Sequence, residues 1–331
     1  MRRQPLISGV TFIATVLSVF LFMVVVITSR VKTVPFPPES CRDRLLVGKF
    51  MHIKKADTNG DSSSGLSHEA AKTLYQDLKG VERTSFMADG TWDAMVKGTL
   101  SETIDVKGRT VDAEFFRIFD HPLLDGRYFT ADEANEGLPV VVISEKTARG
   151  AFGKTDVAGM PISLNHMKYT VLGVVKDNSA LATTASGDVF YPYSPKNFTP
   201  WGESKMDHMF GNTTVALLVK DGVDFQSVRD QVKGRYAELN TKFRADGMEV
   251  IYHESPYDQE VLSSGLFGSN STPDTSGDRM MRYILYAILL LVPAINLSSL
   301  LHSRMHKRVS EIGVRRAFGC TRSRIITDII W

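Results

Sequence analysis

Residues 283–326 read YILYAILLLVPAINLSSLLHSRMHKRVSEIGVRRAFGCTRSRII, an apolar run joined directly to a basic, amphipathic segment. The apolar part, residues 283–301, holds 19 residues without an ionisable side chain. A buried core helix, the alternative, usually has an apolar stretch of only about 10 to 14 residues. The length therefore predicts a membrane-spanning helix, followed at once by a segment that leaves the bilayer.

A second apolar run lies near the N-terminus. Residues 6–27 form a stretch of 22 residues without a charge, which as a helix measures about 33 Å and exceeds a hydrocarbon core of roughly 30 Å. A cleavable signal peptide is the alternative, but its apolar region usually has about 7 to 15 residues and ends in small ones. This run ends in VVVITSR, which favours an uncleaved transmembrane helix over residues 6–28.

The basic residues orient both predicted spans, because Lys and Arg are enriched in cytosolic segments next to the membrane. They precede the first span and follow the second: Arg2, Arg3, Arg304, Lys307, Arg308, Arg315, Arg316, Arg322 and Arg324. We therefore expect residues 1–5 and 302–324 in the cytosol and residues 29–282 outside it.

The net charge of +2 hides a separation of charge along the chain. The two predicted cytosolic ends hold 9 of the 39 Lys and Arg but only Glu311 and Asp328 of the 37 Asp and Glu, which leaves 30 basic and 35 acidic residues between them. A mildly acidic exported domain offers no basic surface to nucleic acid, and topology explains the basic C-terminal part. We expect no nucleic-acid partner.

The two cysteines, Cys41 and Cys320, are predicted on opposite sides of the membrane and therefore cannot pair. A domain of about 250 residues is large enough to bury a core without disulfides.

The exported region contains two β-α-β patterns that bracket an insert. In the first, strands over 45–53 and 81–86 flank a helix that follows the N-cap Ser67 and has an apolar stripe at Ala70, Ala71, Leu74 and Leu78. In the second, a helix over 224–239 lies between strands at 213–220 and 249–253. Residues 56–65, ending in the TNGDSSSG run, are predicted to be a loop.

The insert, residues 114–205, consists of short β-rich runs separated by Gly and Pro, with strands predicted over 139–144, 169–175 and 188–193 and one helix over 145–152. The predicted fold class is α+β: two transmembrane helices flank a two-lobed domain. One lobe is of β-α-β type, formed by residues 40–113 and 206–260, and the mainly-β lobe is inserted into it. Residues 261–282 are predicted to be a linker to the second span.

Four segments carry a resemblance to known families. The runs EFFRIFDHPLLDGRYFTADE (114–133), PVVVISEKTARGAFG (139–153) and YTVLGVVKD (169–177) resemble the periplasmic core domain of MacB-type ABC exporters. The run VSEIGVRRAFGCTRSRI (309–325) resembles the cytosolic segment of FtsX-like permeases. The motifs follow the order found in the family, and the match covers nearly the whole chain.

The resemblance implies the membrane (permease) subunit of a two-component ABC system in a bacterial inner membrane. Such a subunit has four spans, forms a homodimer or a heterodimer with a related permease, and works with a separate ATPase and in some systems with an extracytoplasmic partner protein. Ile325, Ile326, Ile329 and Ile330 are predicted to begin a third span that is cut short at Trp331.

In the run EIGVRRAFG, charged and apolar positions alternate as on a helix that binds in a groove of another protein. By resemblance that groove belongs to the ATPase, and the predicted coupling residues are Val309, Glu311, Ile312, Gly313, Arg315, Arg316, Phe318 and Gly319. The alternative is a helix that lies on anionic lipid, to which each Lys or Arg contributes about 1 kcal/mol. Gly313 and Gly319 favour the protein partner, since glycine costs a helix about 1 kcal/mol relative to alanine.

Signatures of catalysis and metal binding are missing from the sequence. The chain has no P-loop, no H-E-x-x-H, no C-x-x-C and no G-x-S-x-G, and its eight histidines lack metal-ligand spacing. GDSSSG (60–65) is interpreted as a Ser/Gly loop, and Gly126 and Arg127 as a turn glycine with a structural arginine. We expect a non-catalytic chain without a cofactor.

Two functions remain open from the sequence. The first is a transporter subunit that transmits ATP-driven motion through the second span to the exported domain. The second is a two-span signalling receptor that reports an external ligand to the cytosol. The Ile-rich run after residue 324 favours the transporter, because a receptor would continue into a coiled coil or a catalytic domain.

Overall fold

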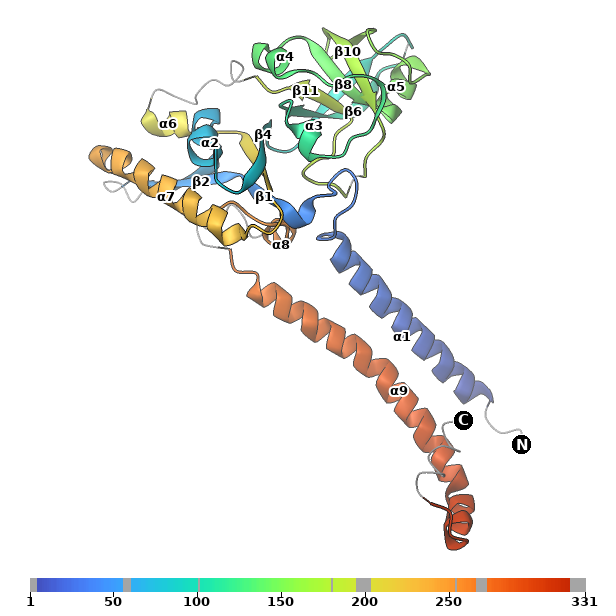
Figure 1. Ribbon diagram of the computed structural model, residues 1–331. Coiled ribbons are helices and arrows are strands. Elements are labelled where there is room, and N and C mark those ends of the chain that lie inside the picture. The colour runs from blue at the N-terminus through green and yellow to red at the C-terminus, as the bar shows by residue number, and fades with distance from the viewer. Residues whose placement is uncertain are drawn as a thin grey trace. The chain divides into compact units, whose positions relative to one another are not determined.

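The computed structural model describes residues 5–55, 61–100, 102–179, 181–194, 204–253, 255–265 and 273–321. The chain divides into a domain, residues 31–275, and a helical unit made of residues 1–30 and 276–331 (Figure 1). Two long helices, α1 (Pro5–Val31) and α9 (Ser276–Ala317), make up the described part of the helical unit.

One half of the domain, here called the sheet lobe, is a sheet with two helices on one face. Its strands run in the order β14-β2-β3-β13-β4, with β1 beside β13 and β12 beside β3. The strands are β1 (Leu45–Gly48), β2 (Phe50–Lys55), β3 (Asp61–Leu66), β4 (Val81–Ala88), β12 (Phe210–Gly211), β13 (Thr213–Val219) and β14 (Met248–Ile251). The helices are α2 (His68–Tyr75), α6 (Lys205–Met209), α7 (Phe225–Phe243) and α8 (Gln259–Ser264).

The two large helices of the sheet lobe form where the sequence predicts them. Ser67 caps α2 by accepting a hydrogen bond from the backbone N–H of Ala70, and Asp224 caps α7 through the N–H of Gln226. The predicted stripe of α2 is buried, and so are Val228, Val232 and Tyr236 of α7. These side chains form a core with one face of the sheet.

Two features of the sheet lobe differ from the prediction. Residues 61–66 form β3, paired with β2 from Phe50↔Gly65 to Lys54↔Asp61, where a Ser/Gly loop was expected. The partner strand supplies the backbone hydrogen bonds that the serine side chains would otherwise compete for. Residues 56–60 of that predicted loop lie outside the described residues. In addition, every sheet-lobe pairing is antiparallel. The strands and helix of each predicted β-α-β unit therefore follow one another along the chain as predicted, but the two strands do not form a parallel pair.

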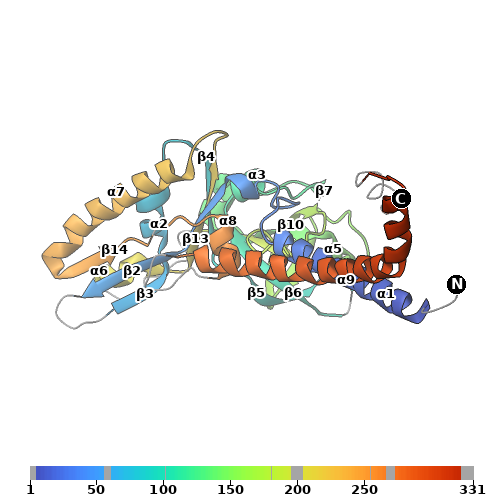
Figure 2. The ribbon, with the colours of Figure 1, turned by 90° about the horizontal axis from the view of Figure 1, so that it is seen from below.

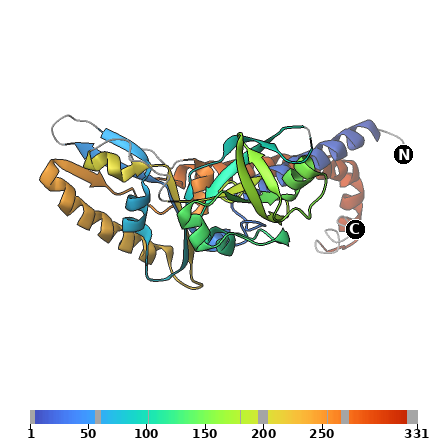
Figure 3. The same ribbon diagram turned by 90° about the horizontal axis from the view of Figure 1, so that it is seen from above.

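The other half of the domain, here called the ring lobe, is a closed ring of six strands. Consecutive pairings run β11-β8-β10-β9-β5-β6, and a parallel pairing of β11 with β6 closes the ring. Its strands are β5 (Trp92–Lys97), β6 (Ile104–Val111), β8 (Val140–Ser144), β9 (Pro161–Leu164), β10 (Met167–Val175) and β11 (Val189–Pro192), and β7 (Leu123–Gly126) pairs with β10. Figure 3 shows the ring lobe, in green, beside the sheet lobe.

The ring begins earlier in the chain than the predicted insert, residues 114–205. Strands β5 and β6 both precede residue 114, and β6 pairs with β5 and β11 in the ring and with β4 of the sheet lobe. The predicted helix over 145–152 is α5 (Glu145–Phe152), and the structure adds the short helices α3 (Phe115–Ile118) and α4 (Ala131–Glu136).

A shared core joins the two lobes. Leu45 and Leu218 on the second face of the sheet, Phe115 on α3, and Val142 and Phe190 on the outside of the ring belong to one buried cluster. The interior of the ring has a separate core, which includes Val141 and Val189 from the alternate positions of the same strands. The lobes are therefore packed against one another through apolar side chains.

Candidate coupling site

The helix α9 runs without interruption from Ser276 to Ala317, a length of 42 residues. At about 1.5 Å per residue this is about 63 Å, roughly twice the thickness of a hydrocarbon core. The predicted second span and most of the predicted coupling segment are thus one helix, with Pro293 inside it. Figure 2 shows that its red C-terminal part turns away from the direction of the rest.

The predicted coupling residues all lie on the end of α9 or directly after it. Val309 is 57% exposed and Phe318 is 88% exposed, while Arg316 is exposed. Apart from its chain neighbours and the backbone of its own helix, no atom of the described residues lies within 4 Å of the position that a Cβ would take at Gly313. The side chains of Glu311, Ile312 and Arg315 lie outside the described residues.

The backbone conformation after Ala317 ends helix α9. The helix ends at Ala317, the N–H of Phe318 donates to the carbonyl of Val314, and Gly319 has φ 87°. This left-handed conformation suits glycine and explains why a glycine follows the last helical turn. Helix α9 therefore has a defined end before Cys320.

Sequence reasoning missed one apolar residue of this segment. Val314 is 56% exposed and precedes Phe318 by four residues, so both side chains lie on one side of the helix. The four-residue spacing of Val314 and Phe318 could have identified Val314 from the sequence. Val309, Val314 and Phe318 together give the last part of α9 exposed apolar side chains among its basic ones.

The first predicted span is the clearest membrane candidate. Residues Phe12–Val31 have a mean hydropathy of 2.6, and in the described part of the chain no other helix passes the same test of length and apolar composition. The hydroxyls of Ser18 and Thr28 donate to carbonyls four residues earlier, at 2.8 and 2.7 Å, and so need no water. Several side chains of residues 283–301 lie outside the described residues, so the second span stays a prediction.

Aromatic contact links the two long helices of the helical unit. The rings of Phe22 on α1 and Tyr286 on α9 meet edge to face, with their centroids 6.1 Å apart. Such pairs are favourable by about 0.5–1.5 kcal/mol beyond the area they bury. Both residues lie in the predicted spans, so the contact supports two helices that pack together.

Hydrogen bonds and an ion pair join α7 to the start of α8, the last helix of the domain before α9. Asp258 caps α8 by accepting hydrogen bonds from the N–H groups of Glu260 and Val261, and Arg229 of α7 binds the same carboxylate at 2.9 Å. The Nε of Arg229 also donates to the carbonyl of Pro256. Helix α8 occupies the first part of the predicted linker 261–282, so the chain is fixed to α7 as far as Ser264.

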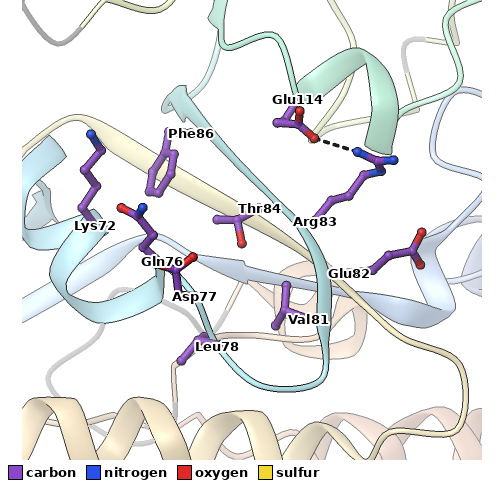
Figure 4. A pocket seen from close by; sticks show the side chains of 10 residues that line it. All are labelled: Lys72, Gln76, Asp77, Leu78, Val81, Glu82, Arg83, Thr84, Phe86 and Glu114. Carbon is purple, nitrogen blue, oxygen red and sulfur yellow. Dashed lines mark hydrogen bonds and ion pairs between the residues drawn. The ribbon is translucent and has the colours of Figure 1, made fainter. Parts of the chain in front are cut away.

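A polar pocket of about 350 Å³ lies between α2 and β4 (Figure 4). Its lining combines side chains of both elements with Glu114, whose carboxylate binds Arg83 at 3.0 Å and Arg117 at 2.6 Å. Phe86 and Leu78 supply the apolar part of the wall. The sequence analysis did not anticipate this pocket, since its residues come from three separate stretches of the chain.

The remaining predicted positions are structural. Gly126 has φ 70° and ends β7, and Arg127 binds the carboxylate of Glu133 through two nitrogens, at 2.7 and 2.8 Å. This hydrogen-bonded pairing lowers the pKa of Glu133 to about 2. Across the described residues no group of three His, Cys, Asp or Glu side chains is arranged to hold a metal ion.

Residues 6–235 match the family described as MacB-like periplasmic core domain. The pyoverdine export ATP-binding/permease protein PvdT of Pseudomonas savastanoi pv. phaseolicola is 22% identical over 222 residues, which are 66% of this chain and 31% of that protein. The uncharacterized ABC transporter permease YknZ of Bacillus subtilis is 22% identical over 258 residues, 76% of this chain and 59% of that protein.

A solved structure, the periplasmic region of MacB from Actinobacillus actinomycetemcomitans, covers 67% of this chain and 94% of its own length with a TM-score of 0.43 and 16% identity. The chain spans about a third of the length of the PvdT relative. That relative is named as both ATP-binding and permease protein, and the family match covers more than half of this chain. The chain belongs to the family of proteins with a MacB-like periplasmic core domain.

Proposed function

We propose that this chain is the permease part of an ABC-type transporter in a bacterial inner membrane. In this proposal the end of α9 binds a separate ATPase in the cytosol. ATP-driven movement of that segment passes along α9 to the domain of residues 31–275 on the other side of the membrane. The chain itself performs no chemistry.

The observation that carries this proposal is the continuity of α9 from Ser276 to Ala317. Helical hydrogen bonds join the apolar stretch to the basic segment, so a displacement of one end is not absorbed by a flexible loop. At the domain end, the ion pair of Arg229 with Asp258 fixes the start of α8 to α7. A receptor would need the same continuity, but the family match favours the transporter.

The exposed side chains on the last part of α9 support a protein partner there. Val309, Val314 and Phe318 are all more than half exposed, and apolar side chains that project from a helix among charged ones suit a groove on another protein. We further propose two copies of the chain, or this chain and a related permease, in each transporter. The substrate and any extracytoplasmic partner are left open by this argument.

The test uses the transporter with its ATPase, in which Gly313→Trp places a bulky ring at a position that the described part of the chain leaves open. Glu311→Lys reverses the acidic charge in the segment. Glu311→Lys should lower co-purification of the ATPase by at least about tenfold, because losing a charged contact at an interface costs about 2–5 kcal/mol. Gly313→Trp should lower it because the ring blocks close approach of the ATPase. ATP hydrolysis stimulated by the permease should fall with it.

Matched controls come from α7, outside the membrane. Gly234 also has open space at its Cβ position, and Glu238 is exposed, so Gly234→Trp and Glu238→Lys make the same changes away from α9. Both controls should bind the ATPase as the wild type does. If Gly313→Trp and Glu311→Lys retain full binding and full stimulation, the segment is a lipid-surface helix and the proposal is wrong.

A further inference from the structure

A buried ion pair lies just beyond the last residue of α1. The Nε of Arg42 donates to Oε2 of Glu39 at 2.6 Å, and the two residues are 2% and 0% exposed. Replacing such a pair with well-packed apolar side chains is often neutral or even stabilising, because burying charges costs hydration. Stability alone therefore gives little reason for a buried ion pair at this place.

Arg42 joins the end of α1 to the ring lobe. One terminal nitrogen donates to the carbonyl of Val31, the last residue of α1, at 2.9 Å. The other donates to the carbonyl of Leu181 at 2.9 Å, 139 residues along the chain. The guanidinium also lies over the ring of Phe36, 4.1 Å from its centroid. A single side chain thus holds the exit of α1 against the loop of residues 181–187.

Glu39 binds the same loop from its other oxygen. Its Oε1 accepts hydrogen bonds from the backbone N–H groups of Thr184 and Ala185, at 2.7 and 2.8 Å. Among the described residues, this carboxylate bonds to the charged Arg42 and to two backbone N–H groups, and hydrogen bonds to charged groups are the stronger kind. Glu39 and Arg42, which are bonded to each other, therefore both bind the loop of residues 181–187.

A second buried arginine fastens the loop to strand β6. Arg109, 3% exposed, donates from Nε to the carbonyl of Ser186 at 2.6 Å and from a terminal nitrogen to the carbonyl of Thr183 at 3.1 Å. Burial lowers the pKa of Arg109 to about 10 against the opposing effect of Glu39, so the side chain is charged at neutral pH. Strand β6 pairs within the ring and with β4 of the sheet lobe.

We propose that Glu39, Arg42 and Arg109 form an anchor that passes displacement of α1 to strand β6. The contacts run from Val31 through Arg42 to residues 181–186, and from there through Arg109 to β6. Helix α1 is then a second transmitting element, and movement reaches the strand at which both lobes meet. These are positioning residues, which act by holding backbone segments. The inference rests on the proposed function, since it places α1 in the membrane and the domain outside.

The test changes the membrane rather than the ATPase. The full chain is reconstituted in lipid nanodiscs of short-chain and of long-chain phosphatidylcholine, because a helix tilts when the bilayer thickness does not match its apolar length. The readout is hydrogen exchange of the β6 amides. In the wild type their exchange should differ between the two lipids by about threefold to tenfold, the equivalent of one hydrogen bond weakened or strengthened.

The decisive variant is the double substitution Glu39→Leu with Arg42→Met, which removes both charges and avoids a lone buried one. It should retain the urea midpoint of the wild type and lose the lipid dependence of β6. The matched control is Arg127→Met with Glu133→Leu, which removes an ion pair of the ring lobe that does not touch residues 31–42. This control should keep the lipid dependence.

Three outcomes overturn the anchor: no lipid dependence in the wild type, full dependence in the Glu39/Arg42 variant, or an equal loss in the control pair. None of them bears on whether the end of α9 binds an ATPase, because that is measured by co-purification. A failed co-purification, in turn, leaves the lipid response of β6 unchanged.

Discussion

The side-chain amide of Gln259 donates a hydrogen bond of 2.9 Å to the carbonyl oxygen of Lys32. These residues are 227 positions apart, yet one directly follows α1 and the other begins α8. The start of the domain and the start of its helix α8 therefore lie side by side. Gln259 is 8% exposed, so water does not compete strongly for this contact.

Substituting Gln259→Leu should loosen this contact without unfolding the domain. One hydrogen bond is lost, at a cost of about 0.5–1.5 kcal/mol, and we expect faster hydrogen exchange in α8. The exposed Gln226, whose amide binds Asp230 on α7, provides the control Gln226→Leu. Equal exchange in α8 for the two variants would contradict the role given to Gln259.

Labelling with a membrane-impermeant maleimide tests the orientation. Cys41 is buried, donates to the carbonyl of Ile118, and has its pKa raised by burial to about 11, so it should not react from either side. An engineered Lys168→Cys on the exposed surface of β10 should be labelled in intact cells. Cys320 should react only after permeabilisation. The reverse pattern would mean that the topology is inverted.

Acid should destabilise the domain through two histidines. Burial lowers the pKa of His68 and of His121 to about 4 from the usual 6.5. Between those pH values the unfolded chain binds more protons than the folded one, so stability falls as the pH falls from 6.5 to 4. Asp112 opposes this, because burial raises its pKa to about 6 and the folded state takes up its proton first.

The two histidines outweigh the single aspartate, so the urea midpoint should be lower at pH 5 than at pH 7. His121 stacks on Phe115 with ring centroids 5.4 Å apart, so His121→Phe should fit and reduce the acid sensitivity. His208→Phe, at an exposed position, should leave it unchanged. An unaltered pH profile in His121→Phe would contradict the assignment.

A fragment of residues 31–275 should fold cooperatively by itself, because its three apolar clusters lie inside the domain. Leu217 is fully buried in the core of the sheet lobe, so Leu217→Ala should lower the free energy of unfolding by about 2–5 kcal/mol. Leu138 is 44% exposed, and Leu138→Ala should cost less than about 1 kcal/mol. Urea titration of both variants measures the difference.

The helices of the domain could be predicted because their signals are local. Ser67 and Asp224 stand directly before apolar residues with helical spacing, and capping and burial then agree within one stretch of chain. The closure of the ring depends instead on the pairing of Val189 with Gly108, 81 positions away, and nothing near either residue indicates that partner. Strand β3 was missed for the same reason, since its serines pair only because β2 lies beside them.

The coupling residues could be proposed from sequence because their charge and apolar spacing lie within a single helix, and they stay a prediction. The anchor was not found, although Glu39 and Arg42 are only three positions apart. At that spacing an acid and a base usually form a solvated surface pair. Their burial comes from residues 181–185, which no local pattern links to residue 39.

Strand β6 pairs both within the ring and with the sheet lobe, and this limits which segments can be exchanged between related proteins to make chimaeras. Because the ring is completed by β5 and β6 from before residue 114, a transplant of residues 114–205 would carry an open sheet with two strands missing. A graft that spans 92–194 would move a closed unit, and among the strand pairings of the described residues it would break only that of β4 with β6, at Met87 and Val111. Chimaeras that respect this seam should fold, and those cut at residue 114 should expose unpaired strand edges and aggregate.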